Sequence, residues 1–457
     1  MDDKKYLIML VLLTGILLTA PSIARILTGN PYMANSEAYD NIRIYNEGST
    51  NYDSLQGRDA PINIMNFIRL EGSAKDILLR IVPIILGILT VIFAYLILHR
   101  QNVSEKTIIA IILFMIISPI FNYTFTEYKP YSFTIFLGVL ALYFLLHDKM
   151  LYAGVAVAII PFIDIVSGVV TLILFLTYML VNHRNKQAYR TTCLALFVAI
   201  MFAVIINAYY GYNILHEFTF ETHNILIDIG ANIGISFSMI ILSIIGLILL
   251  WEDGWRTLAV YIILVLLAAT SVFNDIVLLY LNFIIMVYAG FAFIYLNRRK
   301  WSISIIKKTT ILLIICSIFF STLVYATKVV RSEPTPGYVD ALMFIKGQSL
   351  PTEVILASPE NGYFIEYYSQ RMVFSDDITQ YLDKKRSSDM DIIATSRNLE
   401  RTESMLKEYN IKYVIIDKEF EPYLKEKEGL LFLIDTSKKF TSIYKNEDVE
   451  VWMYVGD

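Results

Sequence analysis

Residues 78–98, LLRIVPIILGILTVIFAYLIL, decide the fold class of this chain. Apart from Arg80 the stretch is uncharged, and as a helix rising about 1.5 Å per residue it is long enough to cross about 30 Å of hydrocarbon. Similar runs recur along the first two thirds of the sequence, and 56% of the 457 residues are hydrophobic while 18% are charged. This balance excludes an ordinary soluble enzyme and indicates a membrane protein.

We predict about eleven membrane-spanning helices, because apolar runs of this length are the signal of such spans. The first run follows Lys4 and Lys5 as a signal peptide would, but it lacks a small-residue cleavage site, so we expect a retained anchor. The expected spans are 6–27, 78–98, 107–123, 130–147, 151–164, 166–183, 191–210, 232–251, 257–273, 276–297 and 309–327.

The distribution of Lys and Arg predicts the orientation, because short loops rich in these residues stay in the cytoplasm. With the N-terminus inside, the inner connections are cationic, from HRQNVSEK (99–106) to NRRKWSISIIKK (297–308). Three connections expected on the other side, 162–166, 209–232 and 272–276, contain no Lys or Arg. We therefore predict that the N-terminus lies on the cytoplasmic side of the cell membrane and the C-terminal segment on the extracytoplasmic side.

The hydropathy changes abruptly at the linker RSEPTPG (331–337). We expect two domains: a polytopic α-helical bundle over 1–328, with an outer loop at 28–77, and a polar domain over 329–457. The polar domain alternates strand-like runs such as KYVIID (412–417) with amphipathic segments, which predicts a small extracytoplasmic α/β domain. Its acids outnumber its bases, which argues against nucleic acid as a partner.

Two carboxylates lie in the first outer loop, in the stretch NSEAYDNIR (35–43). A good N-cap residue precedes them, and Glu37, Asp40 and Arg43 then share one face of a short helix. The structural alternative is that these acids are solvated and complement the dipole of a first helical turn. Arg43 and Arg69, however, are kept in an outer loop against the positive-inside bias, which needs another explanation.

The second outer loop, SPIFNYTFTEYKPYS (118–132), places Glu127 and Lys129 between two predicted spans. A charged pair at that depth is costly unless it faces water or a partner. The alternative is that both are interfacial side chains whose charged ends reach the headgroups. Two separate outer loops that each offer a carboxylate and a cation at one membrane depth favour a functional site.

The outer loop 209–232 contains His216, Glu217 and His223. On a helix the two histidines would share a face with the glutamate close by, which would suit a divalent cation. The spacing is not a diagnostic metal motif, however. The alternative is an interfacial loop whose tyrosines lie at the level of the headgroups.

Other acidic residues have simpler interpretations. Asp164 and Asp275 are predicted at the outer ends of spans, where most acids are solvated, and a role in a cavity is the alternative. Asp389 and Asp391 form a D-x-D at the start of a predicted helix, where acids suit the helix dipole, so we do not expect a metal there.

The first two outer loops resemble those of the GT-C superfamily, polytopic glycosyltransferases that use polyprenyl-phosphate-linked sugars. The resemblance rests on an acid-x-Tyr motif in EAYDNIR (37–43) and on EYKPY (127–131). The stretch 340–377 also resembles the outer α/β domain of archaeal and bacterial members. The resemblance covers most of the chain and implies a membrane enzyme that acts at the extracytoplasmic face.

By this resemblance the enzyme transfers sugar with inversion, so a carboxylate takes the proton from the acceptor hydroxyl. Either Glu37 or Asp40 would be this base, and Glu127 would be a second acid that orients the acceptor or a metal. The leaving phosphate needs cations rather than a general acid. Its contacts would be Lys129, Arg43, Arg69 and Arg80, while Tyr39, His216, Glu217 and His223 would contact substrate or a metal.

The sequence also departs from the superfamily's patterns. No Trp-Trp-Asp motif occurs in the tail, which argues against transfer of a whole glycan to asparagine. No D-x-D occurs in the second outer loop, so a requirement for Mg²⁺ or Mn²⁺ stays open. The expected partners are a polyprenyl-phosphate sugar, membrane lipid and a glycan, lipid or protein acceptor.

Two other classes of function compete with this interpretation. A transporter or flippase would show two matching halves and charge near the middle of the membrane, whereas this sequence shows no duplication and its ionisable residues cluster at one face. A receptor or scaffold that displays the tail would hardly need about eleven spans.

Overall fold

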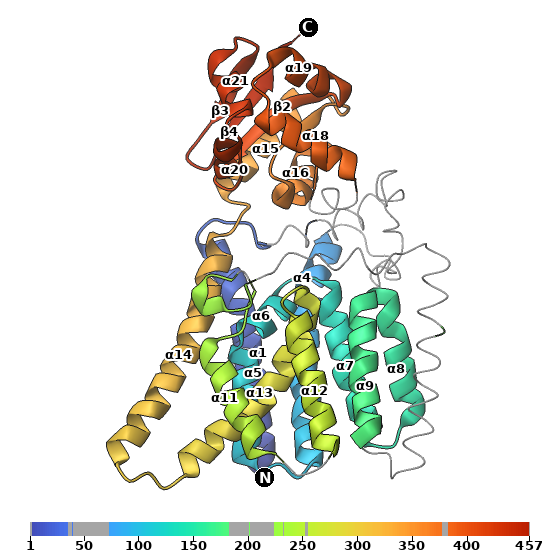
Figure 1. Ribbon diagram of the computed structural model, residues 1–457, viewed down its shortest axis with the longest axis vertical. Coiled ribbons are helices and arrows are strands. Elements are labelled where there is room, and N and C mark those ends of the chain that lie inside the picture. Colours follow the sequence, from blue (N-terminus) through green and yellow to red (C-terminus); the bar gives the residue numbers. More distant parts are fainter. Residues whose placement is uncertain are drawn as a thin grey trace. The chain divides into compact units, whose positions relative to one another are not determined.

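The computed structural model describes residues 2–34, 39, 73–181, 201, 224–231, 233–251, 255–376 and 383–456 (Figure 1). The chain divides into two compact units. The bundle unit comprises Met1–Ile23 and Asp53–Val329, and the C-terminal unit comprises Ala24–Tyr52 and Val330–Asp457. The described residues 28–34 of the predicted outer loop 28–77 thus group with the C-terminal unit.

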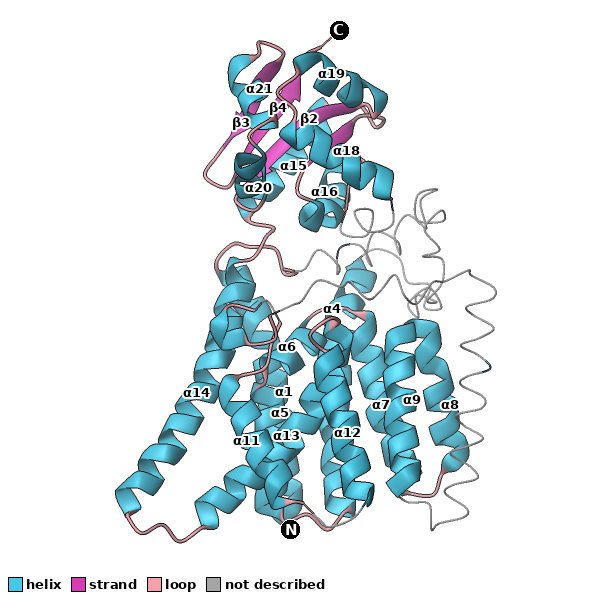
Figure 2. Cartoon of the chain, viewed as in Figure 1, coloured by secondary structure: helices cyan, strands magenta, loops and turns pink. Residues whose placement is uncertain are grey.

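The described part of the bundle unit is built from helices (Figure 2). They are α1 (Asp2–Leu27), α4 (Ser73–Arg100), α5 (Glu105–Ile117), α6 (Pro119–Thr126), α7 (Pro130–Leu146), α8 (Met150–Ile163), α9 (Ile165–Val181), the 3₁₀ turn η3 (Ile227–Ile229), α11 (Phe237–Leu249), α12 (Trp255–Thr270), α13 (Asp275–Arg298) and α14 (Ser304–Arg331).

Several of these helices have the length and composition of membrane spans. Among the described residues, four helical segments are long and apolar enough to cross a membrane alone, and they contain α1, α4, α13 and α14. Helices α5 and α6 meet the same criteria as a pair bent by 62°. The expected membrane-type helical bundle is therefore confirmed, whereas the number of about eleven spans stays a prediction.

The bend between α5 and α6 interrupts the stretch that the sequence predicted as one span, 107–123. Ser118 precedes Pro119 and takes φ −58° and ψ 131°, because a residue before proline avoids the helical region. The backbone carbonyls that lose their helical hydrogen bonds at the bend accept hydrogen bonds from side chains instead. The Asn122 amide donates to the carbonyls of Ile116 and Ser118, each at 3.0 Å, and the Thr322 hydroxyl of α14 donates to that of Ile117 at 2.6 Å.

Helix α13 is the central helix of the bundle unit, packing against α5, α9, α11 and α12. Two glycines allow its closest approaches: a Cβ at Gly290 would collide with Ile111 of α5, and a Cβ at Gly246 of α11 with the Tyr288 backbone. Small residues at helix contacts are how membrane helices pack closely without a hydrophobic driving force between them. Asn282, also in α13, accepts a hydrogen bond at its Oδ1 from the Ser118 hydroxyl at 3.0 Å.

The C-terminal unit is an α/β domain with a four-stranded sheet in the order β1-β2-β4-β3. Strand β2 pairs in parallel with β1 and antiparallel with β4, so it is central, and it is buried along most of its length. The strands are β1 (Val354–Leu356), β2 (Ile411–Asp417), β3 (Phe440–Lys445) and β4 (Val449–Tyr454). The helices are α15 (Pro336–Gln348), η4 (Pro359–Asn361), α16 (Gly362–Ser369), α18 (Lys384–Thr395), α19 (Leu399–Glu408), α20 (Phe420–Lys427) and α21 (Leu430–Thr436).

Arg25 joins the chain that leaves α1 to the linker before α15. Its guanidinium is fully buried and donates to the carbonyls of Pro31 at 2.8 Å, Ser332 at 2.9 Å, Met33 at 3.3 Å and Pro334 at 3.1 Å. A buried cation is tolerated only when its donors are satisfied, and arginine has five N–H donors in a rigid fork. This contact set explains why the residues after Ile23 group with the C-terminal unit.

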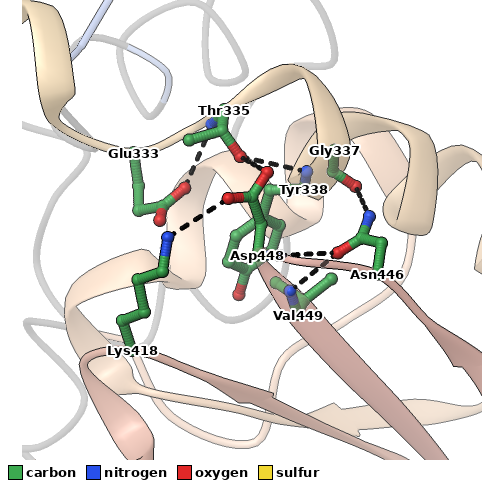
Figure 3. A network of polar contacts seen from close by, with 8 residues as sticks. All are labelled: Glu333, Thr335, Gly337, Tyr338, Lys418, Asn446, Asp448 and Val449. Atoms are coloured by element: carbon green, nitrogen blue, oxygen red, sulfur yellow. Dashed lines mark hydrogen bonds and ion pairs between the residues drawn. The ribbon is translucent and has the colours of Figure 1, made fainter.

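The linker is also tied to the turn between β3 and β4 (Figure 3). The Thr335 hydroxyl caps α15 by accepting from Tyr338 N at 3.2 Å and donates to Asp448 at 2.8 Å. Asp448 also binds Lys418 at 3.3 Å, and the Asn446 amide donates to the Gly337 carbonyl at 2.8 Å. These contacts fix the start of α15 against the sheet.

Carboxylates gather at the end of β2. Asp417 is buried and accepts from Tyr338 Oη at 2.9 Å, Asn361 Nδ2 at 3.1 Å and two backbone N–H groups of the following turn. Beside it, desolvation and the carboxylates of Glu360, Asp417 and Glu333 raise the pKa of Glu419 to about 7.

This cluster predicts a pH dependence of the C-terminal unit. The unfolded chain releases the Glu419 proton near its ordinary pKa of 4.5, whereas the folded unit holds it to about pH 7. The free energy of unfolding therefore falls as pH rises between these values. We expect Glu419→Gln to reduce this fall, measured as hydrogen exchange of β2 peptides in the full-length protein, corrected for intrinsic rates.

The matched control is Glu400→Gln, which changes an exposed carboxylate of α19 and should keep the wild-type dependence. A Glu419→Gln protein whose β2 protection falls with pH as steeply as that of the wild type would refute the assignment.

Candidate active site

Charged and polar side chains collect at one end of the bundle unit. Helix α7 packs against α8, and α8 against α9, so their connections alternate between the two ends. The α6–α7 connection (127–129) and Asp164, between α8 and α9, therefore lie at the same end, as do the last turns of α14 (Figure 1). We call this end the site end.

Glu127 and Lys129 occupy the α6–α7 connection. Glu127 ends α6, and Lys129 precedes Pro130, the first residue of α7. Only 6% of Glu127 and 1% of Lys129 is exposed, which differs from the exposed interfacial pair that the sequence left as an alternative. Lys129 Nζ lies 3.0 Å from the centre of the Tyr123 ring, a cation–π contact, and both charged side chains have further interactions.

Helix α14 contributes a residue that interacts with Glu127. Tyr325 is 6% exposed and interacts electrostatically with Glu127. One turn earlier, Thr322 donates to the Ile117 carbonyl at the α5–α6 bend. Residues three apart share a face of a helix, so Thr322 and Tyr325 place the α5–α6 bend and the Glu127 carboxylate on the same side of α14.

A second acid, Asp228 in η3, fixes the chain before α11. Its carboxylate accepts from Phe237 N at 2.7 Å, from the Ser236 hydroxyl at 3.2 Å and from the Ser321 hydroxyl of α14. Lys328 of α14 donates to the carbonyls of Gly230 at 2.9 Å and Ala231 at 2.6 Å. These contacts attach residues 228–231 and 236–237 to the site end.

Asp164 has a local structural role. Its carboxylate accepts from Ser167 N at 2.5 Å, so it caps the start of α9. The Ser167 hydroxyl accepts from Thr134 of α7 at 3.1 Å, and Thr171 donates to Tyr280 of α13 at 3.4 Å. This buried polar row holds α7, α9 and α13 together near the site end. Asp275 follows Asn274, the residue whose side chain caps α13.

Tyr39, the last residue of the acid-x-Tyr motif, lies in the C-terminal unit. It is 3% exposed, and its hydroxyl donates to the Met33 carbonyl at 3.1 Å. Its ring centre is 6.2 Å from that of Phe364, 5.3 Å from Tyr367 and 5.5 Å from Tyr368, all in α16.

The remaining predicted site residues divide into two groups. Arg80 is described, in α4, where it is exposed. Outside the described residues lie Glu37, Asp40, Arg43, Arg69, His216, Glu217 and His223. Within the described part of the chain, no three His, Cys, Asp or Glu side chains group so as to hold a metal ion.

Sequence reasoning missed three residues that shape these regions. Tyr123 lies six residues before its partner Lys129, across the end of α6, so the spacing signals no shared helix face. Arg25, in the last turn of an apolar span, resembles an ordinary interfacial cation, and so does Lys328. The linker carbonyls that Arg25 binds and the Gly230 carbonyl that Lys328 binds are distant in the sequence, so no local pattern reveals these contacts.

Solved structures of three proteins have the same fold. The oligosaccharyltransferase AglB from Archaeoglobus fulgidus, in complex with an inhibitory peptide and a dolichol-phosphate, matches with a TM-score of 0.61 and 13% identity, covering 96% of this chain and 73% of that one. The arabinofuranosyltransferase AftD from Mycobacteria matches with a TM-score of 0.60 and 13% identity, covering 99% of this chain and 42% of that one.

The third is ArnT from Cupriavidus metallidurans bound to undecaprenyl phosphate, with a TM-score of 0.55 and 8% identity, covering 98% of each chain. No family model and no curated protein matches this sequence. The AglB structure holds a dolichol-phosphate and the ArnT structure an undecaprenyl phosphate. The chain therefore shares the fold of these three proteins, which are glycosyltransferases of the kind that its outer-loop motifs resemble.

Proposed function

We propose that this protein is a membrane glycosyltransferase that moves a sugar from a polyprenyl-phosphate carrier to an acceptor hydroxyl at the extracytoplasmic face, with inversion. The observation that carries the proposal is the buried pair Glu127 and Lys129 at the site end of a GT-C-fold bundle. The structural neighbours bind dolichol-phosphate, undecaprenyl phosphate and an acceptor peptide, which supports a lipid phosphate and an acceptor as partners here.

Lys129 is the proposed contact for the donor phosphate. The leaving group is a phosphate, so catalysis needs positive charge where negative charge develops, and no general acid. Lys129 is a point charge in a site shielded from water, where electrostatic interactions are stronger than in bulk solvent. Its contact with the Tyr123 ring restrains the ammonium group without neutralising it. Further proposed phosphate contacts are Arg43, Arg69 and Arg80.

The proposed base is Glu37 or Asp40, which takes the proton from the acceptor hydroxyl as the glycosidic bond forms. Glu127 is proposed as the second acid, which orients the acceptor. His216, Glu217 and His223 stay proposals as substrate or metal contacts.

A divalent cation, Mg²⁺ or Mn²⁺, stays an open part of the proposal. One structure of the Archaeoglobus fulgidus oligosaccharyltransferase contains Zn and sulfate. The described residues of this chain group no set of three metal ligands, so a metal would need ligands from outside them, and we route no step through one.

Substitution of the carboxylates tests the mechanism. In proteoliposomes supplied with radiolabelled dolichyl-phosphate and undecaprenyl-phosphate sugars, the variant that removes the base, Glu37→Gln or Asp40→Asn, should lose transfer by about 10²- to 10⁴-fold. Glu127→Gln should also lower transfer, and EDTA in parallel reactions tests the requirement for a metal.

The matched control for Glu127 is Glu105→Gln in α5, a carboxylate at the other end of this helix pair that accepts from Tyr95 and should leave transfer unchanged. Full transfer by all three site variants would contradict the mechanism. Robust solute counterflow by the wild-type protein would instead favour a transporter.

Binding of the carrier alone tests the role of Lys129. Lys129→Met keeps the length of the side chain but removes the charge, and it should weaken binding of undecaprenyl phosphate about 10- to 100-fold, the value of a charge-assisted contact. Native mass spectrometry or a radioligand measurement reports the dissociation constant. The control, Lys149→Met, changes an exposed lysine in the α7–α8 connection. Equal affinities for the two variants and the wild type would refute the assignment.

A further inference from the structure

We propose that the Thr126 hydroxyl donates a hydrogen bond to the phosphate of the polyprenyl carrier, beside Lys129. The inference rests on the proposed function for the identity of its ligand, and it adds a phosphate contact that carries no charge. All of its residues belong to the bundle unit, in α6, α7 and the connection between them. The observation behind it is a buried hydroxyl that has no hydrogen-bond partner in the described part of the chain.

The Thr126 hydroxyl differs from those of other threonines in the bundle helices. The hydroxyls of Thr14, Thr90 and Thr124 each donate to the carbonyl four residues earlier, at 2.7, 2.7 and 2.8 Å. This bond satisfies a threonine inside an apolar helix. Thr126 is 1% exposed, yet its hydroxyl bonds to none of the described residues. Because an unsatisfied buried hydroxyl is costly, we infer that its partner is a ligand.

Helix α6 places this hydroxyl on the face that meets Lys129. Tyr123 and Thr126 are three residues apart, a spacing at which helical side chains are neighbours with Cβ atoms about 5–6 Å apart. The centre of the Tyr123 ring lies 3.0 Å from Lys129 Nζ. The hydroxyl and the ammonium group therefore border one region at the end of α6. A phosphate suits both groups, because it offers several acceptor oxygens and negative charge.

The start of α7 adds positive potential to the same region. Lys129 is the N-cap residue of α7, which has 17 residues and begins at Pro130. The partial positive charge at a helix N-terminus favours anions. The Glu127 carboxylate, in the same connection, opposes this effect because it repels a phosphate. An uncharged donor is useful here, since it strengthens phosphate binding without attracting the carboxylate as a second cation would.

Burial determines how the phosphate reaches these groups. Lys129 and Thr126 are each 1% exposed, so the surrounding chain has to open as the carrier enters. Once the phosphate is bound, its oxygens provide the acceptor that Thr126 lacks. Hydrogen bonds to a charged group are stronger in surroundings that exclude water, so this single contact affects the affinity measurably.

The experiment measures binding of undecaprenyl phosphate and dolichyl phosphate to the full-length protein in lipid nanodiscs by native mass spectrometry. Thr126→Val replaces the hydroxyl with a methyl group of similar size, and Thr126→Ser keeps the hydroxyl. The matched control is Thr124→Val, which removes an equally buried hydroxyl of the same helix that has its partner. Undecaprenol, the same chain without the phosphate, reports the contribution of the chain, and thermal unfolding without ligand reports stability.

We expect Thr126→Val to weaken binding of the preferred phosphate carrier about 10-fold, the value of a hydrogen bond to a charged group. Its affinity for undecaprenol should equal that of the wild type. Thr126→Ser and Thr124→Val should both bind the phosphate carrier within about threefold of the wild type, because each keeps the proposed donor. Without ligand, Thr126→Val should unfold at no lower temperature than the wild type, because it removes a buried group that has no bond to lose.

Three results would overturn the inference. The first is an affinity of Thr126→Val for the phosphate carrier equal to that of the wild type. The second is an equal loss of affinity for undecaprenol, which would assign the effect to the chain. The third is a marked fall in the unfolding temperature of Thr126→Val, or its failure to fold, which would give the hydroxyl a structural role.

Failure of the proposed function gives a different pattern. In that case Lys129→Met would bind the phosphate carrier as tightly as the wild type, or the wild type would bind no carrier at all. If Lys129→Met loses affinity while Thr126→Val keeps it, the proposed function stands and only this inference fails.

Discussion

The buried guanidinium of Arg25 is the interaction on which the organisation of this chain depends. It lies at the end of the first apolar helix, where a charge without partners would be costly, and it donates to four backbone carbonyls on two segments distant in sequence. Lysine could not replace it, because three donors on one atom cannot reach carbonyls on both segments in this fork geometry. The contact assigns the residues after Ile23 to the C-terminal unit and so determines which part of the molecule carries the acid-x-Tyr motif.

The bundle unit depends on a similar use of polar groups. The Ser118-Pro119 bend frees carbonyls in an apolar interior, where each unsatisfied group is costly, and Asn122 and Thr322 supply the missing donors. Because the bend ends one helix and starts another, it leads directly to Glu127 and Lys129. Asp228 and Lys328 then attach the segment before α11 to α14 in the same manner. Side-chain bonds to the backbone thus determine the structure of the site end, and apolar packing around α13 supports it.

The two units present their charges differently. In the bundle unit a carboxylate and a lysine are almost fully buried, a placement that a membrane protein keeps where charge has a function. In the C-terminal unit several carboxylates crowd the end of β2, and burial with mutual repulsion raises the pKa of Glu419 to about 7. Asp417 accepts hydrogen bonds from Tyr338 and Asn361, so this carboxylate has a structural role in the domain. The proposed chemistry uses the first arrangement.

The sequence by itself determined the class of the protein. Apolar runs such as 78–98, the change of composition near residue 330 and the short motifs around Tyr39 and Glu127 are local patterns, and each follows from the residues that form it. The sequence also singled out Glu127 and Lys129, although not their burial. Pro119 is a local signal for the bend at Ser118 within the stretch 107–123. Only the tertiary structure decided that Arg25 binds the linker and that Tyr39 rests on α16. These features depend on partners up to about three hundred residues away, and hydropathy or periodicity carries no information about which distant groups a side chain will meet.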